Sequence, residues 1–538
     1  MKKILLLLII ILAFLLRFYR LGDYPALNAD EAAIGYNAYS LIQTGKDEHG
    51  NAWPISFQSF NDYKPGLYFY LVLPFVKVMG LNEWSVRLPN ALLGVATVYL
   101  IYLLIKELGF KNSSEIAAFM LAISPWHIHF SRGGWEVNTA TFFITLGVYL
   151  FIKGLKKPVF WYFSALALGL SLYTYHAARV VVPLLGFCLL LIYRKDVKKH
   201  LGQLLFAMLF SLILLLPLAK DILSPAGISR VSGVGLFSDP GPFNRTNEQR
   251  GEHADFQGNI SKILHNKVVN YGLAFIENWG EHYRGEFLFL TGDDIQRDKV
   301  PETGQMYLFD ILFIAAGLMY LLQNFNKSTK LIFCWVAIAP IAAAFTFQSP
   351  HALRSHNMVI PLVIISALGL INLLNWLKST LPMWIYIATS GVVLILIILN
   401  FSRYAHMYWV HMAKEYPYSS QYGVKELVSY LQDNSQKYNK IIVTDRYDQP
   451  YVLFLFYLKY PPEKFQNSHI LTARDNYGFS TVRDFDKYHF ETIDFDKVRP
   501  ENPNSLIVGT KEEIPKEANI VKKIYGSNGY EYFDLVAN

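Results

Sequence analysis

Two adjacent carboxylates, Asp30 and Glu31, are the residues whose type and position first suggest chemistry. They follow the first apolar stretch, in the run "NADEAAIGYNAYS", where a carboxylate could accept the proton of an attacking hydroxyl group. A structural interpretation competes, because carboxylates in the first turn of a helix are stabilised by its dipole. The residue pattern after the pair predicts a helix over 29–42, capped by Asn28 or Asp30.

Basic residues form a second candidate set, in short links where the charge-bias rule for membrane proteins leaves outer loops neutral. These links contain Arg132 with His127, His129 and Glu136; Arg179 with His176; and Arg354 with His351 and His356. Together with Lys64 of "YKPG", the three arginines suggest one shared anion, most simply a lipid phosphate. Each arginine alone could instead be a helix-end side chain that reaches toward water.

Glu136 lies at the start of a predicted span and is either a helix cap or a second carboxylate of the same pocket. A carboxylate that accepts a hydroxyl proton, beside cations that stabilise a leaving phosphate, is what glycosyl transfer from a lipid-linked sugar requires. The candidate catalytic residues are Asp30, Glu31 and Glu136, and the candidate substrate-binding residues are Lys64, Arg132, His176, Arg179, His351 and Arg354. The acidic residues could hold a divalent cation, but their spacing matches no ligand motif, so no metal ligands are assigned.

The composition indicates that membrane helices position these residues. Of 538 residues, 53% are hydrophobic and 17% are charged, whereas soluble domains carry roughly 25% charged residues. Apolar runs long enough to cross a bilayer, about 20 residues each, number about eleven. They lie near 4–19, 85–105, 115–131, 135–152, 159–176, 178–193, 201–219, 306–323, 331–347, 357–374 and 382–400.

The orientation follows from lysine and arginine in the short links, which are enriched on the cytoplasmic side. With the N-terminus inside, basic residues occupy every inner link: Lys2 and Lys3; Lys106 and Lys111; Lys153, Lys156 and Lys157; Arg194, Lys195, Lys198 and Lys199; Lys327 and Lys330; and Lys378. The three long segments, 20–84, 221–305 and 401–538, then face outward. The predicted location is the cell membrane, with the catalytic face extracytoplasmic.

Two domains are predicted. Residues 1–400 would form a transmembrane catalytic domain that includes the outer loops 20–84 and 221–305. Residues 401–538 would form a small extracytoplasmic α/β domain, because "GVKELVSYLQDN" has a helical pattern, "KIIVTD" and "NSLIVGT" resemble strands, and "YGSNGYEYFDLV" resembles a hairpin. The predicted fold class is therefore a multi-pass α-helical membrane protein of about eleven spans with a small C-terminal α/β domain.

Several function classes lack their usual sequence evidence. The chain contains no GxxxxGK[ST] loop, no CxxC pair and no HExxH motif, which removes the motifs of ATP hydrolysis, thiol redox chemistry and zinc proteolysis. The net charge of +7 does not indicate nucleic-acid binding, because the basic residues fall mostly at the ends of apolar segments.

Three blocks resemble a known family: "NADEAAIGYNAYSLIQTGKD", the block that begins "YKPGLYFYLVLPFVKVMG", and "ISPWHIHFSRGGWEVNTATFF". They are similar to the polyprenyl-phosphate-sugar-dependent glycosyltransferases of the GT-C superfold, the group of dolichyl-phosphate-mannose protein mannosyltransferases and aminoarabinose transferases (family 39-like). The resemblance covers roughly residues 1–375. It implies that Asp30 is the general base, with Glu31 beside it, and that Lys64 grips the donor phosphate.

The resemblance also implies a partner set and leaves alternatives. The donor would be a polyprenyl-phosphate-linked sugar, and no further cofactor is assigned. The enzyme would be a hexosyl- or pentosyltransferase of the mannosyltransferase type, and the acceptor could be a protein, a lipid or a polysaccharide. Gly66 stands where the family commonly has a second proline, which leaves the acceptor undecided. A lipid-linked glycan flippase or transporter is one alternative, and an oligosaccharyltransferase or O-antigen-ligase-like enzyme is another.

Overall fold

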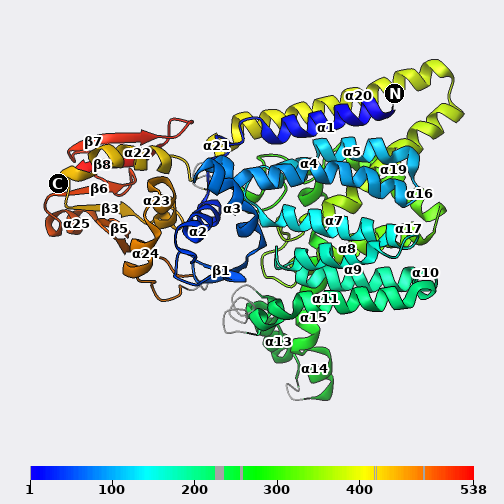
Figure 1. Cartoon of the computed structure of the whole chain (residues 1–538), viewed down its shortest axis with the longest axis horizontal. Coiled ribbons are helices and arrows are strands. Elements are labelled where there is room, and N and C mark those ends of the chain that lie inside the picture. The colour runs from blue at the N-terminus through cyan, green and yellow to red at the C-terminus, as the bar shows by residue number, and fades with distance from the viewer. Residues whose placement is uncertain (1, 224–234, 255–257, 417–418, 420, 476–478) are drawn as a thin grey trace. The chain divides into compact units, whose positions relative to one another are not determined.

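The computed structural model describes residues 2–223, 235–254, 258–416, 419, 421–475 and 479–538 (Figure 1). The chain divides into two compact units. The first, here called the helical unit, comprises Met1–Arg17, Leu92–Ser131 and Glu136–Ala405. The second, here called the mixed unit, comprises Phe18–Ala91, Arg132–Trp135 and His406–Asn538. Packing therefore assigns the first outer segment to the same unit as the C-terminal residues, while the domain division at residue 400 stays a prediction.

One helix, or two consecutive helices, occupies most of each of the eleven apolar stretches. The corresponding helices are α1 (Lys2–Phe18), α4 (Glu83–Glu107), α5 (Ser114–Ile123) with α6 (Pro125–Ser131), α7 (Glu136–Gly154), α8 (Phe160–Leu172), α9 (Ala178–Ile192), α11 (Leu201–Ile222), α16 (Phe309–Gln323), α17 (Lys327–Ile338) with α18 (Ile341–Ala344), α19 (Val359–Thr380) and α20 (Met383–His406). The stretch 115–131 is broken at Ser124, because the following Pro125 disfavours helical backbone at the residue before it.

Six helical segments in the described residues are long and apolar enough to cross a membrane. They are Glu83–Glu107, Glu136–Gly154, Arg194–Ile222, Lys327–Ala344, His356–Thr380 and Met383–Glu415. Four shorter apolar helices are α3 (Leu67–Met79), α8, α9 and α16. The chain is thus a multi-pass helical membrane protein in the coarse sense expected, whereas the count of eleven spans remains a prediction.

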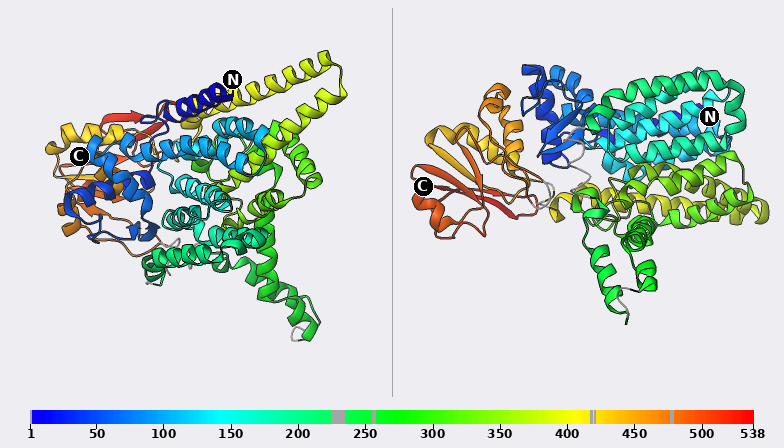
Figure 2. Two further views of the ribbon diagram at one scale, coloured as in Figure 1. Left: turned by 45° about the vertical axis from the view of Figure 1, so that its right-hand side comes forward. Right: turned by 90° about the horizontal axis from the view of Figure 1, so that it is seen from below.

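Helices of the helical unit run side by side, as both views in Figure 2 show. Helices α16 and α19 pack closely against each other, and glycines permit this. A Cβ atom on Gly369 would lie 1.8 Å from the carbonyl oxygen of Phe313, and one on Gly317 would lie 2.0 Å from that of Ile365. Small residues at such crossings let helix backbones touch, which is a common basis of helix packing in membranes.

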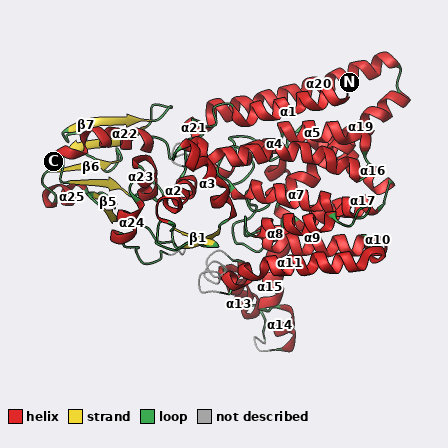
Figure 3. Ribbon diagram, viewed as in Figure 1, coloured by secondary structure: helices red, strands yellow, loops and turns green. Residues whose placement is uncertain are grey.

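The mixed unit contains a six-stranded sheet of order β4-β5-β3-β6-β8-β7, drawn in yellow in Figure 3. Its strands are β3 (Lys440–Thr444), β4 (Asp484–Phe485), β5 (Tyr488–Glu491), β6 (Ser505–Gly509), β7 (Ile520–Tyr525) and β8 (Glu531–Ala537). Strand β3 pairs in parallel with β5 and β6, and β7 pairs with β8 as an antiparallel hairpin. The strand-like runs and the hairpin read from the sequence are confirmed, and so is helix α22 (Val424–Asn434).

Side chains on the two faces of this sheet enter different cores, as the alternation along a strand requires. Ile442 joins a small core with Phe495 of α25 (Phe495–Glu501). Ile441 and Val443 join the main core, which also contains residues of α22, α23 (Pro450–Leu458) and α24 (Pro462–Ser468).

The main core also includes the first outer segment. It takes in Ala32 and Tyr36 of α2 (Ala29–Thr44) and Phe69 of α3, together with Phe456 of α23. A Cβ on Gly35 of α2 would lie 2.6 Å from the Phe456 ring, so α2 and α23 are in close contact. The C-terminal residues therefore help to hold the helix that carries Asp30 and Glu31.

Candidate active site

The start of α2 has a reciprocal cap. The Asn28 side chain accepts a hydrogen bond from the backbone N–H of Glu31 at 3.0 Å, and a Glu31 carboxylate oxygen accepts one from the backbone N–H of Asn28 at 3.2 Å. This capping box satisfies two N–H groups that a helix start leaves unpaired. The predicted helix over 29–42 with Asn28 as its cap is confirmed.

Glu31 forms a buried, two-pronged ion pair with Arg87 of α4. The guanidinium nitrogens Nε and Nη2 of Arg87 donate to the two carboxylate oxygens, each at 2.7 Å. The backbone N–H of Gly134 donates to the same carboxylate at 2.8 Å, and both ionic side chains are almost fully buried. Glu31 is thus occupied by fixed partners, which suits a residue that orients the start of α2 more than one that exchanges protons.

Arg87 also connects the chain that leads into α2. Its Nη1 atom donates to the carbonyl oxygens of Leu21 at 2.9 Å and Pro25 at 2.8 Å. A guanidinium can make such a set of contacts because it has five N–H donors in a fixed plane. Arg87 therefore fixes both the Glu31 carboxylate and the connection between α1 and α2.

Asp30 has a different environment from its neighbour. Its carboxylate accepts a hydrogen bond from Lys64 Nζ. The Asp30 side chain is 23% exposed and the Lys64 side chain is 13% exposed. Lys64 lies on β2 (Asp62–Pro65), which pairs with β1 (Ser56–Ser59), and its ammonium group lies 5.4 Å from the centre of the Phe60 ring. This pair is the part of the α2 start that solvent or a substrate can reach.

A turn after α2 holds two further carboxylates, Asp47 and Glu48, which the sequence reasoning did not single out. Glu48 is fully buried and accepts a hydrogen bond from the Asn37 side chain at 3.2 Å. Burial raises the pKa of Glu48 to about 8, while the hydrogen bond from Asn37 and the charge of Lys64 oppose that rise. The adjacent acids in "GKDEHG" were the available signal, but their burial could not be read from them.

Arg132 is buried and surrounded by fixed partners. Its guanidinium donates to the carbonyl oxygens of Tyr19 at 2.7 Å and Tyr24 at 3.1 Å, and to the hydroxyl of Tyr408 at 3.1 Å. It also lies 5.4 Å from the ring centre of Trp409. This placement favours a role in joining segments of the mixed unit over direct contact with a phosphate.

The remaining sequence candidates belong to the helical unit. Glu136 begins α7 and His176 precedes α9, and both side chains are half-buried. Arg179, also half-buried, donates to the carbonyl oxygen of Leu172 at 3.3 Å. Arg354 donates to the Thr346 hydroxyl at 2.7 Å. The structure therefore places Asp30, Glu31, Lys64 and Arg132 in one unit and these four residues in the other.

His351 belongs to a buried cluster with Asp293 and Asp298. Its Nδ1 atom lies 3.6 Å from a carboxylate oxygen of each aspartate. Burial lowers the pKa of His351 well below its ordinary value, and the positive charges of Arg354 and Arg297 lower it further, so the ring is neutral. The two aspartates were not recognised in the sequence, because they stand in a loop more than 50 residues before the histidine.

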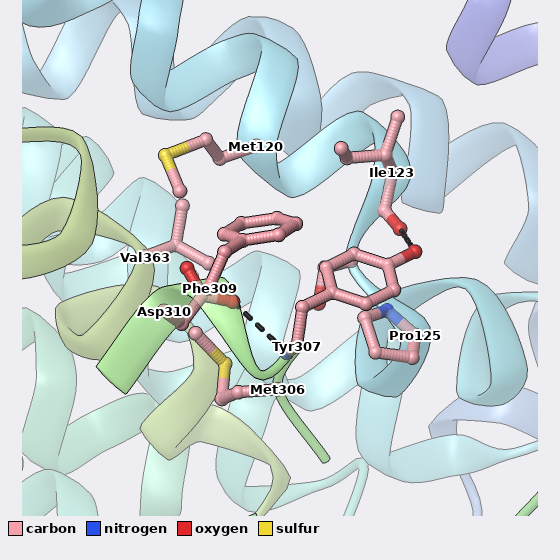
Figure 4. Close-up of a pocket in the computed structure, with 9 residues that line it drawn as sticks. Met120, Ile123, Pro125, Met306, Tyr307, Phe309, Asp310 and Val363 are labelled. Carbon is pink, nitrogen blue, oxygen red and sulfur yellow. Dashed lines mark hydrogen bonds between the residues drawn. The ribbon is translucent and has the colours of Figure 1, made fainter. Parts of the chain in front are cut away.

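A small hollow inside the helical unit contains another buried carboxylate, Asp310 (Figure 4). Asp310 accepts a hydrogen bond from the backbone N–H of Tyr307 at 3.0 Å, and the Tyr307 hydroxyl donates to the carbonyl oxygen of Ile123 at 2.6 Å. The other lining side chains are mostly apolar, among them Met120 and Val363. Asp310, in the first turn of α16, thus binds the backbone just before the helix.

Comparison with known proteins finds a partial match to one family model and a shared fold. Residues 63–219 match the model of a family described as dolichyl-phosphate-mannose-protein mannosyltransferase. An uncharacterized protein of Aquifex aeolicus (strain VF5) is 31% identical over 186 residues, which are 34% of this chain and 36% of that protein. The Bacillus subtilis (strain 168) protein YycA, provisionally named a mannosyltransferase, is 29% identical over 170 residues, 31% of this chain and 25% of that protein.

Two solved structures share the fold over almost the whole chain. ArnT from Cupriavidus metallidurans bound to undecaprenyl phosphate superposes with a TM-score of 0.57 at 11% identity, covering 99% of this chain and 97% of ArnT. Its apo state gives a TM-score of 0.53 at 12% identity, covering 98% of this chain and 97% of ArnT. The resemblance to GT-C glycosyltransferases of this family is confirmed. The alignments with the two curated relatives span about a third and a quarter of their lengths.

Proposed function

We propose that this protein is a membrane glycosyltransferase that moves a sugar from a polyprenyl-phosphate donor to an acceptor hydroxyl at the extracytoplasmic face. The observation that carries the proposal is the accessible Asp30–Lys64 pair, held on a helix start that the buried Glu31–Arg87 pair fixes. A carboxylate and an ammonium group side by side supply the proton acceptor and the phosphate partner that this transfer needs.

In the proposed reaction, Asp30 accepts the proton of the acceptor hydroxyl as its oxygen attacks the anomeric carbon of the sugar. The bond between that carbon and the phosphate oxygen breaks, and its electron pair leaves with the polyprenyl phosphate. Lys64, which contacts Asp30 in the structure, would turn to the phosphate and stabilise the developing charge. Glu31 and Arg87 would hold Asp30 in place throughout.

The sequence candidates of the helical unit stay predictions. Arg179 and Arg354 are predicted partners of the donor phosphate, His176 a predicted polar contact, and Glu136 a predicted carboxylate of the site. Arg132 would hold segments of the mixed unit together, because its N–H groups already donate to backbone carbonyls and a tyrosine hydroxyl. His351 is assigned to the cluster with Asp293 and Asp298 because its Nδ1 atom lies against both aspartates.

The comparisons support the donor class and suggest the sugar. ArnT, which shares the fold, was crystallised with undecaprenyl phosphate, so a polyprenyl-phosphate donor is the natural proposal for this chain. The matched family model and YycA both carry mannosyltransferase descriptions, which makes mannose the first sugar to test.

The test uses the full-length protein in lipid nanodiscs with a synthetic polyprenyl-phosphate mannose. We expect release of polyprenyl phosphate that depends on an acceptor, with transfer of a single sugar. Mass analysis of envelope glycans, glycolipids and glycoproteins with and without the gene would identify the acceptor. Movement of the intact lipid across proteoliposomes without transfer would favour the flippase alternative, and use of a pyrophosphate-linked glycan would favour the oligosaccharyltransferase-like alternative.

The proposed orientation has its own test. In a variant lacking Cys188 and Cys334, a single cysteine introduced at exposed Lys516 should react with an impermeant thiol reagent added from outside intact cells. A cysteine introduced at Lys156 of an inner link provides the matched control, because it should react only after permeabilisation. The reverse pattern would overturn the extracytoplasmic assignment.

A further inference from the structure

Three side chains with metal-ligand chemistry meet in the helical unit, outside the proposed catalytic pair. Asp293 and Asp298 come from the loop before α16, and His351 comes from the loop before α19. One ligand atom from each residue lies within 4.8 Å of the others, and all three residues are buried. Two aspartates and a histidine from separate loops thus converge on one point.

The spacing suits a single ion. His351 Nδ1 lies 3.6 Å from Asp293 Oδ2 and 3.6 Å from Asp298 Oδ2. Donor atoms bound at about 2 Å to one ion lie roughly 3 to 4 Å from each other. The histidine–aspartate separations therefore already match those of ligands that share a metal.

A second observation points into the cluster. Only 5% of the His351 side chain is exposed, and its Nδ1 atom has no hydrogen-bond partner among the described residues. An unpaired buried nitrogen is costly, because it has lost water without gaining a partner. A bound cation would satisfy that nitrogen.

The Asp293 carboxylate is oriented by backbone groups, and the positive charge of Lys299 acts on it only from beyond ion-pair distance. It accepts hydrogen bonds from the N–H of Ile295 at 2.8 Å and from the N–H of Ala352. Within the described part of the chain, no lysine or arginine lies within ion-pair distance of Asp293. Each oxygen keeps a second lone pair, so the carboxylate can still bind a cation.

The histidine is held by a second layer of contacts. The backbone N–H of His351 donates to His282 Nε2 at 3.1 Å, and His282 Nδ1 contacts the carbonyl oxygen of Asn278 at 2.8 Å. These contacts hold the backbone at His351 through the ring of His282. The loop that carries His351 is therefore held in place for ligation.

We propose that Asp293, Asp298 and His351 bind one divalent transition-metal ion that ties the loop before α16 to the loop before α19. Imidazole nitrogen with carboxylate oxygen suits ions such as Zn²⁺ and Mn²⁺, whereas Mg²⁺ and Ca²⁺ prefer oxygen ligands alone. The ion is structural, and Arg354 lies three residues after His351 in the loop it would steady. The inference does not depend on the proposed transferase activity.

The first experiment measures metal content. The full-length protein, purified without chelators, should contain about one zinc or manganese ion per chain by plasma mass spectrometry, as one three-residue ligand set implies. Asp293→Asn and His351→Gln should each reduce the content at least about tenfold. Glu302→Gln is the matched control, because Glu302 is an exposed acid of the same loop that pairs with Arg403.

The second experiment uses only the wild-type protein, so misfolding of a variant cannot affect its result. The wild-type protein, stripped by a chelator and shown by its circular dichroism to remain folded, is titrated with Zn²⁺, Mn²⁺, Mg²⁺ and Co²⁺. We expect saturable binding of the transition metals and, for Co²⁺, visible absorption bands that report nitrogen ligation. No transition-metal binding by the folded protein, binding of Mg²⁺ alone, or equal loss of metal in Glu302→Gln would overturn the proposal.

Discussion

The start of α2 in the mixed unit and the loop cluster of the helical unit both bury carboxylates, but they compensate the charge differently. Glu31 has its own guanidinium, since Arg87 contacts both of its oxygens. Asp293 has two backbone N–H groups and, as neighbours, a second carboxylate and a neutral imidazole. Glu31 thus has a side-chain cation at contact distance, whereas Lys299 acts on Asp293 only from beyond ion-pair distance, and Asp293 belongs to the proposed metal-ligand set.

Glu48 shows a third way to bury a carboxylate. Its raised pKa of about 8 means that a proton neutralises it over much of the physiological range. Arginine, proton and metal ion are thus three solutions to one problem, because an isolated buried charge is far too costly to persist. Burial alone therefore does not identify a functional carboxylate, and the group that compensates its charge must be known as well. Asp30 is the candidate base because it is partly exposed and its partner is the mobile ammonium group of Lys64.

The largest expected effect is that of Asp30→Asn on activity. The amide keeps the shape of the side chain but cannot accept the proton of the acceptor, so the transfer rate should fall by about 100- to 10,000-fold. Initial rates with saturating donor are the measurement. Asp23→Asn, at an exposed position of the same segment, should leave the rate unchanged. Near-normal turnover of the Asp30 variant would transfer the role to another carboxylate such as Glu136.

Glu31→Gln should instead act mainly on stability. Removing one partner of a buried ion pair leaves the other charge uncompensated, which typically costs about 3 to 5 kcal/mol. Thermal unfolding in detergent is the measurement. The control is Glu83→Gln, which breaks the more exposed pair with Lys425 and should cost at most about 1 kcal/mol. Equal losses in the two variants would show that the Glu31–Arg87 pair is no more than a surface contact.

Glu48→Gln should change how stability depends on pH. The pKa of Glu48 is about 8 in the folded protein and near the ordinary 4.5 when unfolded. Between these values the folded state holds the proton that the unfolded chain has released. Stability from this group is therefore present below pH 4.5 and is lost as the pH rises toward 8.

The Glu48→Gln side chain stays neutral, so its unfolding midpoint should fall less steeply over that window than the wild-type midpoint. The difference in slope should be at most ~1.4 kcal/mol per pH unit, the value for one proton. Parallel wild-type and variant profiles would contradict the buried, protonated state of Glu48.

The smallest expected effect is that of a chelator, and it separates the two sites directly. Removal of a bound ion should lower the unfolding temperature of the wild-type protein by a few degrees, because a ligand that binds only the folded state stabilises it. Glu31→Gln should keep this sensitivity, and His351→Gln should lose it. A chelator response that persists in His351→Gln would place the metal elsewhere.

Local features of the site could be predicted from the sequence. Hydropathy located the helices, and residue pattern located α2, its Asn28 cap and strands β3 and β6. These succeed because each depends on residues within one short segment. The break at Ser124 was missed for a local reason, since Pro125 interrupts an otherwise apolar run.

Partnerships over long distances could not be predicted. Arg132 was interpreted as an outer cation for a phosphate, yet it engages the carbonyl oxygens of Tyr19 and Tyr24, more than 100 residues earlier. Arg87 stands in the first turns of an apolar helix, and a charge there was the available signal. The residues next to Arg87 do not indicate that its partner is Glu31, which lies 56 residues earlier in the sequence.

The sequence by itself determined the helical membrane character of this chain, the chemical type of its candidate residues and their resemblance to a family. Only the tertiary structure decided which of those residues are accessible, which are locked in ion pairs, and which meet across loops. The physical reason is that hydropathy and capping act within a segment, whereas the partner of a charge depends on which segments pack together. Asp30 and Glu31, adjacent in the chain, therefore differ in accessibility because Lys64 and Arg87 reach them from different elements.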